Sequence, residues 1–480
     1  MRPFEIAIHL SLATVLFGFL LFPHHRTRWI NYLPILALFL VAIHLATEGY
    51  RWQMIPAYAV AGVLFLFSLR QLGGGVASRG VTSRLNSQKW VGVACVAGLL
   101  LLSLSATLGT ILPVPALPAP NGPYPVGTTI YHFVDETREE IYNNNSNDKR
   151  EIMVQVWYPT TSDNDAEVAP WIDHASTFVP ALAEFSGLPP FMLNHLISLR
   201  SNSFADAPLA PSEASYPVIV YSHGWTGFRA LNSNQMETLA SHGYVAVGID
   251  HTYGALATIF PDGRLVPNNP DALPNEDSVP AEVYDRASNV LVNVYASDVR
   301  FVLDQLAALN AGEGEGRFTN RLDLERIGVF GHSTGGGAMV KVCSMDERCK
   351  AGLGMDAWVK PLEEETITQG VTQPFLFMRS DKWTSGKNDK RLSQLIAAST
   401  GAHYRLAITG TLHRDFTMHS LLSPLITVMG VSGPLDGRRA LQIMDDYLLA
   451  FFDKHLKAEN VPLLDGPSPD YREVQFEKDK

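Results

Sequence analysis

The segment Gly331-His-Ser-Thr-Gly335 has the pattern Gly-x-Ser-x-Gly. The apolar residues of 327–330 predict a short buried strand before it, and Ala338–Val342 predicts the start of a helix after it. A sharp turn between strand and helix strains the serine backbone and exposes its hydroxyl above the sheet. Side chains in place of the two glycines would collide with the neighbouring strand and helix. We therefore interpret Ser333 as a catalytic nucleophile rather than a chance serine in a glycine-rich turn.

A serine nucleophile needs a base to take its proton and an acid to hold that base. In this architecture the order along the chain is serine, acid, histidine. Four histidines follow Ser333, namely His403, His413, His419 and His455. His403 begins a predicted strand, and His419 and His455 belong to predicted helices, whereas His413 lies in a loop directly after the last buried strand. We predict that His413 is the base.

Two aspartates are candidates for the acid. Asp356 follows the predicted strand Ala351–Met355, and Asp381 follows the predicted strand Phe375–Met378. Both lie at C-terminal ends of parallel strands, where the active sites of open α/β sheets form. The chemistry of the residues alone leaves both open.

The negative oxygen formed at an attacked carbonyl needs two N–H donors. One is predicted to be the backbone N–H of Thr334, the residue after the nucleophile. The other comes from the loop Ser222–Thr226 after an earlier buried strand. Within that loop we expect Trp225 to donate its backbone N–H and Gly224 to allow close backbone approach.

The elements that must position these groups alternate between buried strands and helices. Such alternation predicts a parallel sheet with helices on both faces, an α/β domain over residues 128–480. A polar, Asn-rich loop is expected at 135–150, and irregular structure at 160–211. The other predicted strands are Thr128–Phe133, Glu151–Tyr158, a strand from Tyr216 into the Gly224 turn, Gly243–Asp250 and Tyr404–Ile408; the predicted helices include Asn234–His242, Ala281–Asn310 and Gly437–Leu456.

The first 112 residues contain four apolar runs, and we expect a multi-pass α-helical membrane region there. A spanning helix needs about 20 residues. The first and last runs meet that length, and the two middle runs reach it only with flanking interfacial residues. The runs are Ile6–Phe22, Leu33–Ala46, Ile55–Leu69 and Val91–Leu112. A proline-rich linker at 113–127 is expected to separate this region from the α/β domain.

Charges in the loops predict the orientation of this region. Loops rich in Lys and Arg stay in the cytoplasm. The loop after the first run and the loop after the third carry the positive charges, so the α/β domain is expected outside the cytoplasm. If only one of the two middle runs failed to cross, this orientation would reverse. The residues concerned are Arg26, Arg28, Arg70, Arg79, Arg84 and Lys89.

Composition limits the remaining possibilities. The net charge of -11 without a basic stripe argues against nucleic-acid binding, and the three cysteines form no metal-ligand pattern. Cys343 and Cys349 are either a disulfide, which an oxidising compartment would permit, or two unrelated thiols. The apolar element Leu188–Leu199 is expected either to touch the bilayer or line lipid access, or simply to pack on the sheet edge.

Several motifs together resemble the platelet-activating-factor acetylhydrolase family, the plasma and intracellular type II branch of the α/β-hydrolases. The resemblance covers roughly Gly122 to Leu456. The motifs are Gly122-Pro-Tyr-Pro-Val-Gly127, Val156-Trp-Tyr-Pro159, Tyr221-Ser-His-Gly224 with Phe228-Arg229, Asp250-His251, Gly331-His-Ser-Thr-Gly-Gly336, Met355-Asp-Ala-Trp358, His413 with Asp415-Phe416, and Lys454-His-Leu456.

The resemblance implies an α/β-hydrolase fold and cleavage of short or oxidised sn-2 acyl chains of phospholipids without calcium, so neither cofactor nor metal is expected. It implies Asp356 rather than Asp381 as the acid. The chain departs from the family by its membrane region, by Trp225 in place of a smaller aliphatic residue, and by Thr334 in place of an aromatic one. Those two positions border the acyl site and leave the acyl chain open. The competing functions are a polyester or cutin-type hydrolase and a non-catalytic membrane-anchored binding module.

Overall fold

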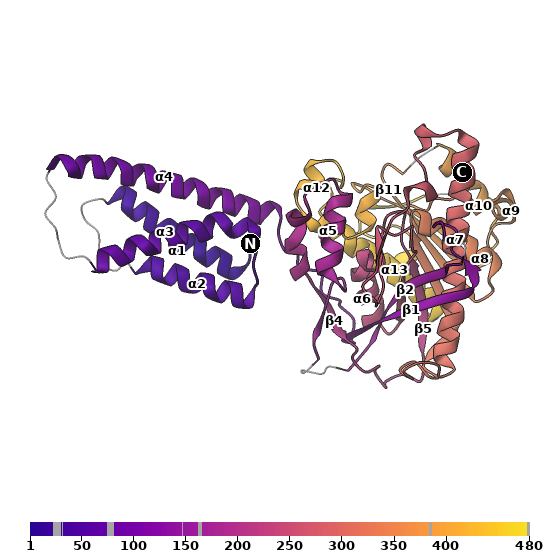
Figure 1. Ribbon diagram of the computed structural model, residues 1–480. Coiled ribbons are helices and arrows are strands. Elements are labelled where there is room, and N and C mark those ends of the chain that lie inside the picture. Colours follow the sequence, from indigo (N-terminus) through magenta and orange to yellow (C-terminus); the bar gives the residue numbers. More distant parts are fainter. Residues whose placement is uncertain are drawn as a thin grey trace. The chain divides into compact units, whose positions relative to one another are not determined.

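The computed structural model describes residues 1–22, 30, 32–73, 81–145, 147–161, 166–383 and 386–477. The chain divides into two compact units, which Figure 1 shows in ribbon form. The first unit holds Met1–Pro115 and two short later segments, Pro189–Leu199 and Leu422–Pro424. The second unit holds the rest of the chain, so two pieces of sequence from within the α/β region belong to the first.

Each of the four N-terminal apolar runs forms a helix. Among the described residues, three helical segments are long and apolar enough to cross a membrane, namely Pro3–Leu21, Trp52–Arg70 and Lys89–Ile111. The remaining apolar helix, α2, has 15 residues and falls short of that length. The helices of this unit are α1 (Pro3–Leu21), α2 (Leu33–Thr47), η2 (Trp52–Met54), α3 (Ile55–Gly73) and α4 (Val81–Ile111). The charged loop residues Arg26, Arg28 and Arg79 lie outside the described residues.

Ion pairs and hydrogen bonds gather around the start of α1 and the end of α2. The buried guanidinium of Arg51 lies 2.7 Å from the Glu5 carboxylate. The His44 ring lies between Glu48 at 2.8 Å and the Tyr58 hydroxyl at 2.7 Å. Glu5, His44 and Glu48 converge as metal ligands can, but the Glu5 carboxylate is already paired with two cations, Arg2 and Arg51.

Within the apolar element predicted at Leu188–Leu199, residues 189–199 belong to the first unit and form the 3-10 helix η3 (Pro190–Ser198). The Trp52 ring meets Phe191 edge-on at 5.5 Å, and its indole N–H donates to the Met192 carbonyl at 3.1 Å. Exposure of the element is mixed, because Phe191 is half exposed, Met192 and Ile197 are partly buried, and Leu196 is buried.

An 11-stranded sheet forms the centre of the second unit, in the order β13-β12-β11-β10-β9-β5-β6-β2-β1-β4-β3. The six strands from β12 to β6 are all parallel, and β2 pairs antiparallel with β6. The parallel strands are buried hydrophobic runs, as expected for a sheet covered on both faces. They are β5 (Tyr216–Ser222), β6 (Val245–Asp250), β9 (Leu322–His332), β10 (Cys349–Met355), β11 (Phe375–Ser380) and β12 (His403–Ile408).

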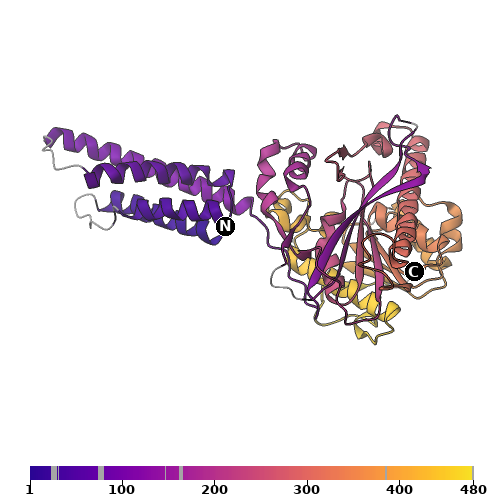
Figure 2. The same ribbon diagram turned by 60° about the horizontal axis from the view of Figure 1, so that its bottom comes forward.

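Helices cover both faces of this sheet (Figure 2). Helices α7 (Ala281–Asn310) and α8 (Thr334–Met345) pack together on one face, and α6 (Ser233–Ser241) and α13 (Gly437–Leu456) pack together on the other. The predicted mostly parallel α/β architecture is therefore confirmed. The other elements are α5 (Ala175–Phe185), α9 (Glu364–Gln369), α10 (Gly386–Ala398), α11 (His419–Leu422), α12 (Leu425–Val428), β3 (Val168–Pro170), β4 (Arg200–Ala205), β7 (Ala257–Ile259), β8 (Leu265–Pro267) and β13 (Val474–Phe476).

The first two strands are longer than the sequence predicts. Strand β1 runs Val126–Glu139 and β2 runs Lys149–Pro159, so the expected loop at 135–150 shrinks to 140–148. Pairing explains the difference, because Asp135 lies opposite Arg150 in the antiparallel ladder. Cross-strand bonding thus keeps a polar sequence extended. The region 160–211, expected to be irregular, contains β3, α5, η3 and β4.

A disulfide joins Cys343 at the end of α8 to Cys349 at the start of β10, with Cα atoms 5.2 Å apart. The alternative of two unrelated thiols is therefore wrong. The bridge closes the short turn between the helix that follows the Ser333 turn and the strand that leads to Asp356.

A buried carboxyl lies between α6 and α13. Asp445 accepts a hydrogen bond from the Asn234 side-chain amide at 3.0 Å and one from the Thr238 hydroxyl at 3.3 Å. Burial raises the pKa of Asp445 to about 8, because a carboxylate loses its hydration there. Since an unfolded Asp has a pKa of about 3.9, the folded chain retains a proton that the unfolded chain releases.

We expect the free energy of unfolding to fall as pH rises from 6 to 8, by roughly 1 kcal/mol per pH unit from this group. Asp445→Asn keeps the shape of the side chain but cannot lose a proton. The free energy of unfolding of this variant should therefore fall less between pH 6 and 8 than that of the unsubstituted protein. Thermal melts at several pH values measure the difference. Asp271→Asn, at an exposed position, is the control and should keep the slope; an unchanged slope in Asp445→Asn would contradict the assignment.

Candidate active site

Ser333 occupies a strained turn between β9 and α8. Its φ of 55° and ψ of -117° are unfavourable for any residue with a side chain. A Cβ added to Gly335 would lie 2.0 Å from the Ser222 carbonyl oxygen on β5, and one added to Gly331 would lie 2.4 Å from the Gly335 backbone. The two glycines are therefore required, as the sequence predicts, and the turn presses directly against the neighbouring strand.

The end of β10 braces this strained residue. The Ser333 N–H donates to the Met355 carbonyl at 2.9 Å, and the Ser333 carbonyl accepts from the Trp358 N–H at 2.9 Å. Strands β9 and β10 are paired up to His332 and Met355. The same two strands thus fix both the serine turn and the residue after Met355, which is Asp356.

The structure brings His413 to Asp356. The His413 Nδ1 lies 2.9 Å from Asp356 Oδ2, and Asp356 is fully buried. Ser380, the last residue of β11, donates its backbone N–H to one Asp356 oxygen at 2.6 Å and its hydroxyl to the other at 2.7 Å. The other candidate acid, Asp381, is exposed and accepts from the Gly410 N–H at 3.3 Å.

The His413 ring lies between two other aromatic rings. The Trp383 ring stacks on it with centroids 4.1 Å apart and an interplanar angle of 12°. The His332 ring lies 4.5 Å away, and its Nε2 is 2.9 Å from the His413 carbonyl oxygen. Burial lowers the pKa of His332 well below its usual value, so it is a neutral ring that donates to that carbonyl. The His413 ring is thereby held in one plane.

The remaining histidines are engaged elsewhere. His419 contacts the Thr417 hydroxyl at 2.6 Å, and burial lowers its pKa to about 4. The His455 ring contacts the Tyr404 hydroxyl at 3.1 Å, and His403 is exposed at the start of β12. Of the four candidates, His413 is the one in contact with a buried carboxylate.

In the described part of the chain, the Ser333 hydroxyl has no hydrogen-bond partner. Catalytic hydrogen bonds are often long in the absence of substrate and tighten in the Michaelis complex. The serine is partly exposed, and 32% of the His413 side-chain surface is accessible, whereas Asp356 is sealed. A substrate carbonyl can therefore reach Ser333, whereas the Asp356 carboxyl group is excluded from solvent.

Two backbone N–H groups next to the serine suit a developing negative oxygen. Thr334 is the first residue of α8, so its N–H has no partner within the helix and lies at the positive end of the helix dipole. Gly224 approaches so closely that an added Cβ would lie 3.0 Å from Ser333 Cβ. Trp225 follows it, and the described residues provide no acceptor for its backbone N–H.

Sequence reasoning missed three neighbours of this site: Ser380, His332 and Trp383. Ser380 and His332 end the parallel strands β11 and β9. Polar residues at strand ends beside a candidate acid or nucleophile are a signal that would have found them. Trp383 lies in a loop, and nothing local to its sequence indicates that it stacks on a histidine 30 residues later.

Comparisons with known proteins identify the family of this chain. The family described as platelet-activating factor acetylhydrolase, isoform II, matches residues 112–463. A platelet-activating factor acetylhydrolase of Canis lupus familiaris is 25% identical over 366 residues, covering 71% of this chain and 77% of its own. A probable 1-alkyl-2-acetylglycerophosphocholine esterase of Arthroderma benhamiae is 25% identical over 391 residues, covering 75% and 93%.

A solved structure has the same fold. A ferulic acid esterase from Streptomyces cinnamoneus superposes with a TM-score of 0.64 at 28% identity, covering 76% of this chain and all of that one. The fold is thus the α/β-hydrolase fold that the sequence predicts, and the related proteins are esterases. This chain is a carboxylic ester hydrolase that belongs to the platelet-activating factor acetylhydrolase, isoform II, family.

Proposed function

We propose that this protein hydrolyses short acyl esters at the sn-2 position of phospholipids through a Ser333–His413–Asp356 triad. The observation that carries the proposal is the 2.9 Å contact between His413 Nδ1 and the buried Asp356, next to a serine in a strained Gly-x-Ser-x-Gly turn. The two relatives described above are named for acetyl esters of such lipids, which supports the choice of substrate class.

In the acylation step, Ser333 Oγ attacks the ester carbonyl while His413 Nε2 takes the hydroxyl proton. Asp356 accepts from His413 Nδ1–H, which keeps the ring in the correct tautomer and stabilises the imidazolium. The two carbonyl π electrons move to the oxygen, which accepts from the N–H groups of Trp225 and Thr334. When the intermediate collapses, the glycerol oxygen leaves with the proton from His413, and the acyl group stays on Ser333.

In the deacylation step, a water molecule gives its proton to His413 and attacks the acyl-serine. The same two N–H groups accept the second oxyanion. Collapse returns the proton to Ser333 Oγ and releases the carboxylic acid. Ser380 supports both steps, since its two hydrogen bonds hold the Asp356 carboxyl group in place beneath His413.

We expect Ser333→Ala, His413→Ala and Asp356→Asn each to lower kcat by about 10⁴-fold or more, because the three residues act as a unit. Hydrolysis of a p-nitrophenyl ester measures this, with a fluorophosphonate probe reporting on Ser333 directly. Melting temperatures serve as the folding control. The assignment fails if the Ser333→Ala, His413→Ala double variant is far slower than either single one.

The competing functions give different outcomes. A polyester hydrolase would turn over a soluble polyester oligomer faster than a 2-acetyl phospholipid, and a binding module would leave Ser333 unlabelled in the folded protein. A series of sn-2 chains of two to sixteen carbons measures the acyl preference. We expect the shortest chains to react fastest, because the bulky Trp225 follows Gly224, which approaches Ser333 closely.

We also propose that the N-terminal helices anchor the enzyme in a membrane, with the hydrolase unit outside the cytoplasm. Three helices have the necessary length and composition. This orientation keeps the loops after the first and third helices in the cytoplasm, so the 15-residue helix α2 must cross as well. At 1.5 Å per residue, a helix of that length needs a locally thin bilayer. The disulfide between Cys343 and Cys349 supports an oxidising compartment.

A membrane-impermeant fluorophosphonate applied to intact cells should therefore label Ser333 without permeabilisation. The matched control is Ser333→Ala, which should take no label on either side. Labelling of the unsubstituted protein only after permeabilisation would reverse the orientation and would mean that α2 does not cross.

A further inference from the structure

Four family-motif residues at the ends of β5 and β6 have no part in the proposed triad. They are Ser222, His223, Asp250 and His251, and all are at most 2% exposed. They lie under the loop that carries Gly224 and Trp225. Burying two imidazoles and a carboxylate is costly unless each is hydrogen-bonded, so their hydrogen bonds indicate what they hold in place.

Two of these residues, Ser222 and His251, join Asp298 of α7 in a second serine–histidine–aspartate chain. The Ser222 hydroxyl lies 2.8 Å from His251 Nε2, and His251 Nδ1 lies 2.9 Å from Asp298 Oδ2. Asp298 is ion-paired with Arg150, and the His251 ring stacks on Tyr295 at 3.7 Å. Ser222, His251 and Asp298 are each 0% exposed. No substrate can reach this chain, so its role is to hold structure.

The hydrogen-bond directions in this cluster are fixed. Asp298 is charged, since Arg150 and hydrogen bonds outweigh burial and hold its pKa below the usual range. His251 Nδ1 therefore carries the proton, and His251 Nε2 accepts from the Ser222 hydroxyl. The His251 backbone N–H donates to His223 Nε2 at 3.2 Å. Because Nε2 of His223 is an acceptor, its proton lies on Nδ1.

The proton on His223 Nδ1 points at the carbonyl of the next residue. His223 Nδ1 lies 2.7 Å from the Gly224 oxygen, which also accepts from the Gly227 N–H at 2.8 Å. A trans peptide is planar, so its C=O and N–H point in opposite directions. Holding the Gly224 carbonyl oxygen therefore fixes the direction of the Trp225 N–H.

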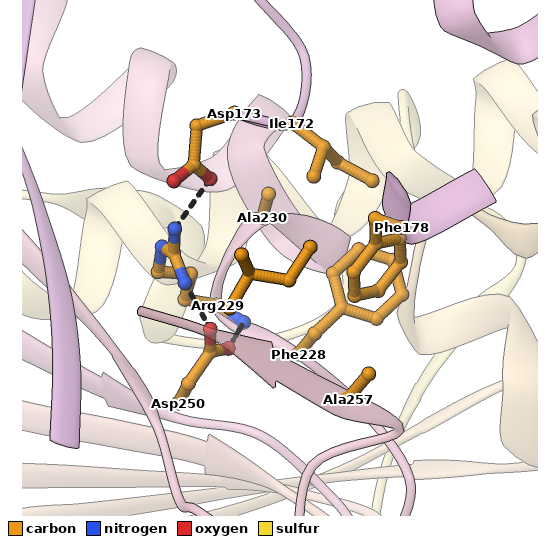
Figure 3. Close-up of a pocket in the computed structure, with 9 residues that line it drawn as sticks. Ile172, Asp173, Phe178, Phe228, Arg229, Ala230, Asp250 and Ala257 are labelled. Atoms are coloured by element: carbon orange, nitrogen blue, oxygen red, sulfur yellow. Dashed lines mark hydrogen bonds and ion pairs between the residues drawn. The ribbon is translucent and has the colours of Figure 1, made fainter. Parts of the chain in front are cut away.

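Asp250, which precedes His251 at the end of β6, holds the far end of this loop. Asp250 accepts from the Arg229 backbone N–H at 2.6 Å and from its guanidinium, which also contacts Asp173 (Figure 3). The cavity beside Arg229 has a free volume of about 10 Å³, room for about one water molecule, so it is no acyl site. Between the two ends, the Thr226 N–H donates to the Gly254 carbonyl at 2.9 Å.

We propose that His223 is a positioning residue for the oxyanion site, held by the buried Ser222–His251–Asp298 chain and acting through the Gly224 carbonyl to aim the Trp225 N–H at the substrate oxygen. This inference rests on the proposed function, in which Trp225 is an oxyanion donor. It assigns a role to the His223 and His251 positions of the motifs Tyr221-Ser-His-Gly224 and Asp250-His251.

Two substitutions at His223 separate aiming from packing. His223→Asn keeps a nitrogen at the position of Nδ1, so the bond to the Gly224 oxygen survives while the bond from the His251 N–H is lost. His223→Gln is closer to histidine in size and can still accept from the His251 N–H, but it lacks the donor at the δ position. If His223 only fills space, His223→Gln should have the higher kcat. If His223 aims the Trp225 N–H, His223→Asn should have the higher kcat.

We expect His223→Gln to lower kcat by about 10- to 100-fold with KM nearly unchanged, because the oxyanion forms only in the transition state. His223→Asn should keep kcat within about 5-fold of the unsubstituted enzyme and yet melt at a lower temperature than His223→Gln. A trifluoromethyl ketone, which forms a tetrahedral adduct on the serine, should lose affinity for His223→Gln in step with kcat/KM.

The proposal is overturned if kcat follows the melting temperatures, with Gln above Asn, or if ketone affinity is unchanged in His223→Gln. Either result leaves the proposed function standing, provided that the unsubstituted enzyme is active and Ser333→Ala is not. An inactive and unlabelled unsubstituted protein would instead overturn the proposed function, and this inference with it.

Discussion

The contact between the serine turn and strand β5 is the constraint on which the rest of the site depends. No atom larger than hydrogen fits on the Gly335 Cα, because the Ser222 carbonyl occupies that space. Pressing the turn this closely onto β5 forces Ser333 to a positive φ, a conformation that costs about 1–3 kcal/mol. The cost is tolerated because backbone bonds from Met355 and Trp358 hold the residue on its other side.

The same contact connects the serine turn to the loop that carries Gly224 and Trp225. Ser222 touches Gly335 through its carbonyl and holds His251 through its hydroxyl. A rigid stack of backbone therefore extends from Ser333 through β5 to the buried imidazoles. Preorganised dipoles of this kind need no rearrangement when charge develops, which is how an oxyanion site lowers a barrier.

Burial has opposite consequences for the different ionisable groups of the hydrolase unit. Asp298 stays charged because Arg150 and His251 donate to it, whereas burial raises the pKa of Asp445, whose partners are neutral, to about 8. Asp356 receives two bonds from Ser380 and one from His413. For Asp298 and Asp445, the partners rather than the depth of burial therefore decide whether the carboxyl keeps its proton.

The sequence alone determined the features that contiguous residues encode. The Gly-x-Ser-x-Gly turn between a buried strand and a helix is local, and so are the apolar helices and the alternation of strands and helices. Helices α7 and α13 begin and end at the predicted residues because their apolar periodicity lies within the segment itself. The lengths of β1 and β2 were missed, since polar residues such as Asp135 remain extended only through their partner strand.

Only the tertiary structure decided which distant residues meet. Residue chemistry left Asp356 and Asp381 equal, and the ends of β10 and β11 bring Asp356 and Ser380 together while Asp381 faces solvent. The pairing of Cys343 with Cys349, the stacking of Trp383 on His413, and the chain from Asp298 to Gly224 likewise depend on packing. The physical reason is that a sequence pattern fixes local backbone geometry, whereas distances between elements follow from strand order and close packing of the core.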